Sequence, residues 1–257
     1  MIFNLYKQRG ETPLECIQRF VDANPDLKGE KMTYLGRLDP LAEGVLLVAS
    51  GDDVKRKEEF LGLDKEYDFV SIFGFATDTY DILGKIVRVE RLNDLSENDI
   101  RKISMIYEGE REQEYPKYSS KMISLSRKQK TASPLTPPPR GGEEETDIPS
   151  RKITIHKIQF HKIDALNNKE LFGRLLMDIS KVRGDFRQHE ILILWRDMLT
   201  KYPNIKTFLG RFSAHVSSGT YIRSLVNDMG NTLGCGATAL SIKRNRVGDY
   251  KIEDSIK

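Results

Sequence analysis

Asp39 is the residue of this sequence best placed for chemistry. It lies in the segment LGRLDPLAEG, residues 35–44, which leads directly into the apolar run VLLV at 45–48. An aspartate before proline is pushed away from helical backbone, which favours a loop here. A carboxylate in a tight loop at the mouth of a buried strand keeps a fixed position, and the glycines let a bulky ligand approach the backbone. A surface turn begun by Asp-Pro explains the same residues equally simply.

Two further side chains suit a functional site, although each also has a plain structural explanation. Tyr67 begins a stretch rich in aromatic and β-branched residues, which predicts a strand. Arg223 lies in the first turn of a predicted helix, one residue away from its apolar face. Taken separately, they are typical of a half-buried strand tyrosine and a helix-surface arginine, because isolated motifs often mislead.

The elements predicted around these residues are a mixture of strands and helices. Apolar alternation and β-branched runs predict strands at residues 1–7, 44–50, 67–76, 86–89, 151–160 and 208–216. Turn residues at 78–84 predict a β-hairpin between two of them. Apolar residues at helical spacing predict helices near residues 12–21, 96–107, 171–179, 185–198 and 222–233. The clearest helix start is a capping box of Thr12 and Glu15, with Pro13 at the first helical position.

The composition indicates a soluble globular protein without a disulfide framework. Of its 257 residues 31% are charged. The sequence contains no run of about 18 apolar residues, which is the length needed to span a membrane. The N-terminus lacks a signal-peptide pattern, so we expect a reducing cytoplasm. Cys16, Cys235 and four scattered histidines show no zinc-ligand spacing, and we expect no metal. A net charge of +3 leans only weakly toward polyanionic partners.

Residues 127–150 differ in kind from the rest of the chain. They contain five prolines, two adjacent glycines and the acidic run EEE at 143–145. Such a segment cannot form a packed element, so we expect a mobile Pro-rich loop rather than a domain boundary. An inert linker and a loop that folds over a ligand both remain open.

Several segments, in their order along the chain, resemble the TruB-type tRNA pseudouridine synthases. The similar motifs are GRLDPLAEGVL at 36–46, DKEY at 64–67, FGFATDTYD at 73–81 with Gly84, the stretch 113–119 with Pro116, Tyr118 and Ser119, SGTYIRSL at 218–225 and GCGA at 234–237. Together they extend over most of the chain with the family's approximate spacing. Several weak motifs in one order are far more specific than any one of them.

The resemblance implies a fold, a reaction and a partner. We expect a single α+β catalytic domain over residues 1–257, with a mixed, mainly antiparallel central β-sheet and flanking helices, and no C-terminal RNA-binding domain. The family breaks the N-glycosidic bond of the T-loop uridine at tRNA position 55 and rejoins the ribose to C5 of the same base. It uses no cofactor and no metal. The expected partner is therefore the T-arm stem-loop of tRNA, bound by a monomeric enzyme.

The resemblance also implies roles for individual residues. Asp39 resembles the essential aspartate, which acts as a nucleophile at the sugar or stabilises a charged sugar intermediate. Tyr67 resembles the tyrosine that stacks on the base and is a candidate for proton transfer. Arg223 resembles the arginine that pairs with the aspartate, since a neighbouring guanidinium keeps a carboxylate ionised. The expected substrate-binding residues are Lys7, Tyr34, Arg37, Tyr118, Tyr221 and Ile242, the last as an apolar side chain packed against the pocket.

Two residues and one segment depart from the family's pattern. Tyr34 stands where the family has a histidine; a tyrosine can stack on an unpaired base but offers no imidazole. Arg37 stands where a small residue is usual, and it either touches a phosphate or biases Asp39 electrostatically. The helical stretch at 165–202 is longer than the family's spacing, and it has no predicted role.

Two alternatives to the tRNA reaction remain open at this point. A uridine in a folded loop must be extruded to react, which calls for a basic groove and recognition of RNA shape. The departures at Tyr34 and Arg37 leave room for the same chemistry on a different RNA. An RNA-binding or RNA-folding protein with dispensable catalysis is the other alternative. The joint presence of Asp39, Tyr67 and Arg223 argues against it, because binding alone does not need all three.

Overall fold

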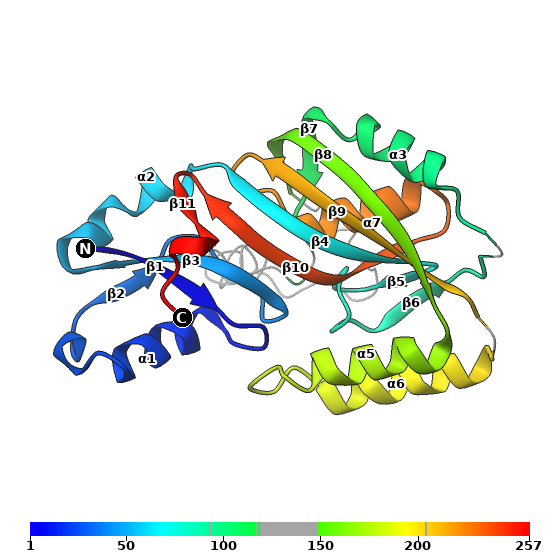
Figure 1. Cartoon of the computed structure of the whole chain (residues 1–257), viewed down its shortest axis with the longest axis horizontal. Helices are drawn as coiled ribbons and strands as arrows, with labels where there is room; N and C mark the ends of the chain where they lie inside the picture. Colours follow the sequence, from blue (N-terminus) through cyan, green and yellow to red (C-terminus); the bar gives the residue numbers. More distant parts are fainter. Residues whose placement is uncertain (93, 117, 119–148, 204) are drawn as a thin grey trace, which may run out of the picture.

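One large β-sheet runs through the molecule, and helices pack against both of its faces (Figure 1). The computed structural model describes residues 1–92, 94–116, 118, 149–203 and 205–257. The observed mixed sheet with flanking helices confirms the predicted α+β class. The predicted loop at 127–150 lies outside the described residues, except for its last two positions.

Within the described residues the sheet has nine strands, and all but one of their pairings are antiparallel. Its main path is β1 (Ile2–Lys7), β3 (Ala42–Ser50), β10 (Ala237–Val247), β4 (Lys65–Phe73), β9 (Thr207–Val216), β8 (Ser150–Leu166) and β7 (Gly109–Glu114). Two short strands, β2 (Met32–Tyr34) and β11 (Tyr250–Lys251), pair with β3 and β10. The one parallel pair, β3 with β10, places Arg244 opposite Gly44 at the end of the Asp39 loop.

A second sheet of two strands, β5 (Phe75–Thr77) and β6 (Ile86–Val89), forms the predicted hairpin. The predicted strand at 67–76 is wrong in one respect, because it is two strands. Gly74 adopts φ +92° between them, a conformation that glycine reaches without strain. Its amide donates to the carbonyl of Gly236, and its carbonyl accepts from the amide of Glu90.

The helices are α1 (Pro13–Asp22), α2 (Lys57–Leu61), α3 (Glu97–Ile106), α5 (Asn168–Ile179), α6 (Gln188–Lys201) and α7 (Ile222–Thr232), with single 3₁₀ segments at Pro25–Leu27, Gly51–Arg56 and Ile252–Asp254. The Thr12–Glu15 capping box of α1 is confirmed. Helix α6 begins at Gln188 and not at Asp185, because the Gln188 side chain turns back to accept the amide of Phe186. The sequence patterns missed β10, although it lies in the middle of the sheet.

Two apolar cores cover opposite faces of the sheet. On one face, α3 and α7 pack against Phe69 of β4 and Phe212 of β9, whose rings stack 5.1 Å apart. On the other face, α5 and α6 bury Trp195 against Ile72 of β4 and the β5 hairpin. The long helical segment without a predicted role therefore forms half of the second core. Burial of such large apolar side chains is the main stabilising contribution in a domain of this size.

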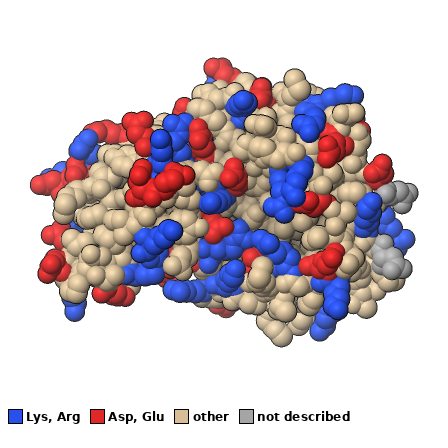
Figure 2. Space-filling view, viewed as in Figure 1, with Lys and Arg blue, Asp and Glu red and all other residues tan. Residues whose placement is uncertain are grey.

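The surface is mixed in charge. In Figure 2 acidic and basic side chains are interspersed over the face shown, and Lys and Arg gather toward its middle. Within the described residues, none of the helices combines the length and apolarity needed to cross a bilayer.

Candidate active site

The loop that carries Asp39 is held from below by a buried lysine. Lys7, at the end of β1, is fully buried, and its ammonium donates to the carbonyls of Gln8 (3.2 Å), Pro40 (3.2 Å) and Ala42 (2.6 Å). Burial lowers the pKa of Lys7 to about 8, although the negative charge of Glu11 opposes this shift. The ammonium thus fixes the backbone on the C-terminal side of Asp39.

A buried arginine holds the other side of the same loop. The guanidinium of Arg244 donates to the carbonyls of Val45 (2.8 Å), Gly36 (3.1 Å) and Arg37 (3.4 Å). Gly44 (φ +107°) lets β3 approach the Arg244 backbone, since any Cβ at this position would collide with the Arg244 carbonyl. The parallel pairing of β3 with β10 therefore brings Arg244 under the loop.

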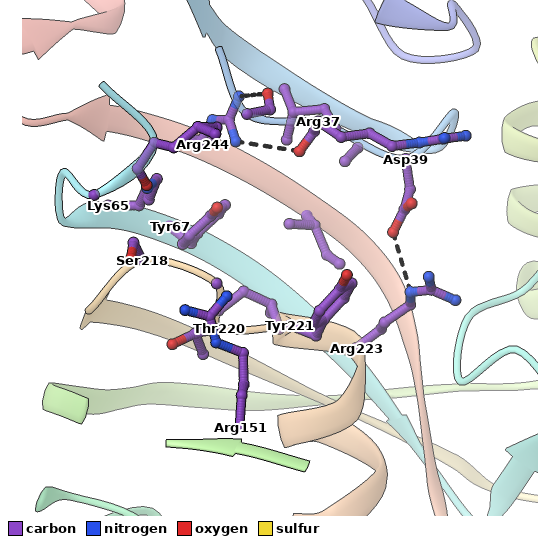
Figure 3. Close-up of a pocket in the computed structure, with 18 of the residues that line it drawn as sticks. Arg37, Asp39, Lys65, Tyr67, Arg151, Ser218, Thr220, Tyr221, Arg223 and Arg244 are labelled. Atoms are coloured by element: carbon purple, nitrogen blue, oxygen red, sulfur yellow. Dashed lines mark hydrogen bonds and ion pairs between the residues drawn. The ribbon is translucent and has the colours of Figure 1, made fainter. Parts of the chain in front are cut away.

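Asp39 meets Arg223 across the pocket (Figure 3). Nε of Arg223 lies 3.0 Å from Oδ2 of Asp39, and Nη1 donates to the carbonyl of Thr79 at 2.9 Å. The Arg223 side chain is 4% exposed and that of Asp39 30%, so the carboxylate is the member of the pair open to a ligand. Burial disfavours the Arg223 charge, but attraction by Asp39 and Asp81 outweighs this and raises the pKa of Arg223.

Asp81 is a buried carboxylate that also acts on the charge of Arg223. Its Oδ1 accepts from the hydroxyl of Thr79 (2.6 Å) and from the amide of Leu83 (3.0 Å). Burial raises the pKa of Asp81, although Arg223 opposes the shift. Asp81 orders the turn whose carbonyl at Thr79 receives Arg223, so it supports the orientation of the guanidinium.

Tyr67 and Lys65 point from β4 into the same pocket (Figure 3). Tyr67 is buried, and the Lys65 ammonium donates to the carbonyls of Leu61 and Leu63. Burial lowers the pKa of Lys65 to about 8, and the positive charge of Arg244 adds to this effect. The two carbonyl contacts hold the loop that precedes β4, and they therefore fix the start of the strand that carries Tyr67.

Tyr221 precedes α7 and is anchored by a glutamine from β7. The Gln113 side chain accepts from the Tyr221 amide (2.8 Å) and donates to the Tyr221 carbonyl (3.1 Å). The ring of Tyr115 packs edge-on against that of Tyr221, with centroids 5.9 Å apart. Gln113, Tyr115 and Tyr118 of the one family-like segment therefore meet residues 218–225 of another at the pocket.

The pocket has a volume of about 660 Å³, enough for a nucleoside. Its floor carries a carboxylate and its walls carry cations and aromatic rings. The charged, aromatic and apolar side chains of the lining include those of Arg37, Asp39, Lys65, Tyr67, Tyr118, Arg151, Tyr221, Arg223, Ile242 and Arg244. No histidine or cysteine belongs to the lining among the described residues, so this pocket offers oxygen and nitrogen chemistry from carboxylate, phenol and guanidinium groups.

The structure brings together seven of the nine residues singled out from the sequence. Asp39, Tyr67, Arg223, Arg37, Tyr118, Tyr221 and Ile242 all line the pocket. Lys7 and Tyr34 do not. The Lys7 ammonium is fully buried against three carbonyls. Tyr34, on β2, packs instead against a small apolar cluster that includes Cys16 and Phe20 of α1, and the Lys57 ammonium lies 5.8 Å from its ring centroid.

Sequence reasoning missed Arg244, Lys65 and Arg151 as pocket residues. Lys65 was within reach, because it belongs to the DKEY motif beside Tyr67. Arg244 carried no signal, since the strand that places it was not predicted. Arg151 is the second residue of β8, and it reaches the pocket only because β8 meets the turn at residues 218–220.

Comparisons with known proteins show which family the chain resembles. Residues 25–181 match the family described as TruB family pseudouridylate synthase (N terminal domain). The chain is 31% identical to the tRNA pseudouridine synthase B of Thermotoga petrophila, over 98% of this chain and 64% of that protein. It is 30% identical to the protein of the same name from Clostridium kluyveri, over 99% of this chain and 70% of that protein. The chain thus spans about two thirds of the length of these relatives.

The fold is also similar to solved structures of lower sequence identity. One chain in "Crystal Structure of a Cbf5-Nop10-Gar1 Complex" aligns with a TM-score of 0.54 at 21% identity, over 97% of this chain and 49% of that one. A chain in "Structure of H/ACA RNP bound to a substrate RNA containing 2'-deoxyuridine" aligns with the same TM-score at 20% identity, over 97% and 48%. Since the family match covers more than half of the sequence and the relatives align along nearly all of it, the chain belongs to the TruB family of pseudouridylate synthases.

Proposed function

We propose that this chain is a tRNA pseudouridine synthase that isomerises the T-loop uridine at position 55, with Asp39 as the catalytic carboxylate. The observation that carries the proposal is the Asp39–Arg223 ion pair at 3.0 Å, on the floor of a cationic pocket of nucleoside size. The names of the relatives support tRNA as the substrate. We further propose that residues 1–257 act as a single, monomeric catalytic domain.

The reaction exchanges one bond of the uridine for another. The bond from N1 to the ribose C1′ breaks, the base turns, and a bond from C5 to C1′ forms. The proton on C5 leaves, and N1 gains one, so the product is an isomer of the substrate. Positive charge develops at C1′ when the first bond breaks, and the exposed oxygens of Asp39 supply the negative charge that stabilises it or bonds to it.

Arg223 keeps the carboxylate ionised and oriented. Its guanidinium is anchored to the Thr79 carbonyl, so it cannot follow Asp39 if the loop moves. Tyr67 and Tyr221 line the same pocket and offer aromatic faces against which an extruded base can stack. Tyr67 is also a candidate to receive or return the C5 proton, because it is the phenol beside the carboxylate floor.

The cations of the pocket rim suit the phosphates that flank an extruded nucleotide. Arg37 and Arg151 are the arginines whose guanidinium groups have no structural duty comparable to that of Arg244 or Arg223 among the contacts described. An arginine binds phosphate bidentately and stays charged, which favours a polyanionic ligand at this opening. Arg37, which departs from the family pattern, supports a second candidate function: the same isomerisation on a different RNA.

The test is conversion of an unmodified T-arm stem-loop, with pseudouridine mapped at single-base resolution. We expect the wild type to convert the T-loop uridine and Asp39→Asn not to convert it. Asp68 is an exposed carboxylate on the same strand as Tyr67, and we expect Asp68→Asn to convert the uridine at the wild-type rate. Conversion confined to another RNA would favour the second candidate. Tight binding without conversion by the wild type would show an RNA-binding protein instead.

A further inference from the structure

Three side chains that are far apart in the sequence converge on the sheet away from the pocket. Nε2 of His156 lies 3.1 Å and Nε2 of His215 lies 3.7 Å from the same carboxylate oxygen, Oδ2 of Asp64. The three ligand atoms all lie within 4.8 Å of one another. The spacing of the histidines in the sequence predicted no metal site, because the residues come from three different strands or their ends.

The architecture of the sheet explains how the cluster forms. His215 on β9 alternates with Ala214 and Val216, which belong to the core under α3 and α7, so His215 faces the opposite side of the sheet. On β8, Ile155 pairs with Val216 and Lys157 pairs with His215, which leaves His156 as the extra residue of a β-bulge. A β-bulge changes the direction of a side chain, and this one turns His156 toward the Asp64 carboxylate that His215 also contacts.

Asp64 completes the row from the neighbouring strand. It directly precedes β4, whose Glu66 pairs with His215, and its carbonyl accepts from the amide of Gly248 at 2.9 Å. That bond anchors the backbone that carries the carboxylate. The cluster therefore stands on three adjacent strand positions, on the side of the sheet opposite Tyr67 and the catalytic pocket.

The separations fit the geometry of a transition-metal site. A tetrahedral ion with bonds of about 2.0–2.1 Å holds its ligand atoms about 3.3 Å apart. The two histidine–carboxylate separations, 3.1 and 3.7 Å, bracket that value. The side chains of His156, His215 and Asp64 are 36%, 35% and 45% exposed, so water can reach the remaining coordination position. Two imidazoles and one carboxylate are donors that suit Zn²⁺ and neighbouring divalent ions better than Mg²⁺ or Ca²⁺.

We propose that Asp64, His156 and His215 form a binding site for one divalent transition-metal ion of the Zn²⁺ type, separate from the catalytic pocket. The ion ties together β4, β9 and β8 at one end of the sheet. The proposal does not depend on the function proposed above, because its ligands are not part of the pocket lining.

The test is isothermal titration calorimetry with Zn²⁺. The untagged chain of residues 1–257 is first stripped of metal with a chelator and is then titrated. The wild type binds one ion per chain, and His156→Ala or His215→Ala weakens binding by at least about tenfold. Asp64→Asn, which keeps the shape and removes the charge, weakens it as well. His161→Ala is the matched control, because His161 is the extra residue of the second bulge in β8 and contacts only Ser213 Oγ (2.9 Å) in the described contacts.

A second measurement separates a site from a fold defect. Zn²⁺ raises the thermal midpoint of the wild type and of His161→Ala, but not that of His156→Ala or His215→Ala, while the metal-free midpoints of all four agree. The proposal is overturned if the wild type takes up no ion at a ratio of one, or if His156→Ala and His215→Ala bind Zn²⁺ as tightly as His161→Ala does. Equal weakening by His161→Ala would also overturn it, since it would show diffuse surface binding.

Discussion

At the scale of single residues, the candidate site depends on two arginines with different duties. Arg223 contacts the carboxylate that faces the ligand, whereas Arg244 contacts only backbone carbonyls beneath it among the described contacts. We therefore expect Arg223 to act on the proposed chemistry and Arg244 on the position of the loop. Substitutions at the two positions separate these effects.

Replacing Arg223 removes the cation beside Asp39. We expect Arg223→Gln to lower the single-turnover rate on the T-arm stem-loop by about 100-fold or more, because a charged group fixed at a reacting centre contributes on that scale. Arg223→Lys retains the charge but cannot contact both Asp39 and the Thr79 carbonyl in the same way, so its rate falls between the two. A wild-type rate for Arg223→Gln, measured at saturating enzyme, would contradict the assigned role.

Replacing Arg244 removes the side-chain donors to three carbonyls, that of Val45 in a buried contact and those of Gly36 and Arg37 in partly buried ones. We expect Arg244→Met to lower the free energy of unfolding by about 2–4 kcal/mol, since each buried acceptor left unpaired is costly. Urea denaturation measures this loss. Arg244→Lys, which restores one donor, recovers part of the stability and part of the activity together. If stability were lost while the rate of the folded fraction stayed at the wild-type value, Arg244 would not position the loop.

The depressed pKa of Lys65 predicts a pH dependence of stability. The folded-state pKa of about 8 lies below the ordinary value of 10.5. Between these values the unfolded chain holds a proton that the folded chain has released, so stability rises with pH in this window. We expect the unfolding free energy of the wild type, relative to Lys65→Met, to increase from pH 8 to pH 10. A constant difference across that window would show that Lys65 titrates normally in the fold.

At the scale of elements, the parallel pairing of β3 with β10 decides the geometry of the site. It is the single parallel pair among the named strands, and it requires glycine where β3 crosses Arg244. The loop before β3 carries Asp39, and β10 carries Arg244 and Ile242. One pairing thus places the loop with the proposed catalytic carboxylate, the arginine that supports this loop, and part of the pocket wall.

Gly44 tests this pairing directly. We expect Gly44→Ala to lower the unfolding free energy by more than about 1 kcal/mol, because alanine is strained at φ +107° and its Cβ meets the Arg244 carbonyl. Gly173→Ala in α5 is the control, since a Cβ there meets nothing and alanine favours the helix by about 0.5–1 kcal/mol. Denaturant midpoints of the two variants should move in opposite directions.

At the scale of the whole molecule, a net charge of +3 is modest for the RNA-binding role proposed above. Affinity must therefore come from where the cations lie, and several of them line one pocket. Release of counterions from neutralised phosphates makes such binding sensitive to salt. The steepness of that dependence counts the phosphates engaged.

Salt titration identifies which cations contact phosphate. We expect Arg37→Ala and Arg151→Ala each to weaken binding of the T-arm stem-loop and to reduce the slope of log affinity against log salt by about one. Lys28→Ala, an exposed lysine that does not line the pocket, should leave the slope unchanged. If all three variants changed the slope alike, the pocket would not be the route of the RNA backbone.

The sequence alone determined the features that depend on local order along the chain. The capping box at Thr12, the strands around Tyr67 and 208–216, and the apolar faces of α5 and α7 follow from short-range patterns. The order of the motifs identified the family, and with it Asp39, Tyr67 and Arg223 as candidates. These inferences need only neighbouring residues, because capping and hydrophobic periodicity act over a few positions.

The meeting of residues that are distant in the sequence follows from the three-dimensional fold alone. It gave Lys7 a supporting role beneath the loop, set Tyr34 apart from the pocket and added Arg244 from a strand without a clear sequence pattern. It also brought Asp64, His156 and His215 together across three strands, aided by a bulge. The central pairings, of β10 with β3 and β4 and of β4 with β9, join segments more than one hundred residues apart, and no local pattern of residue types encodes them.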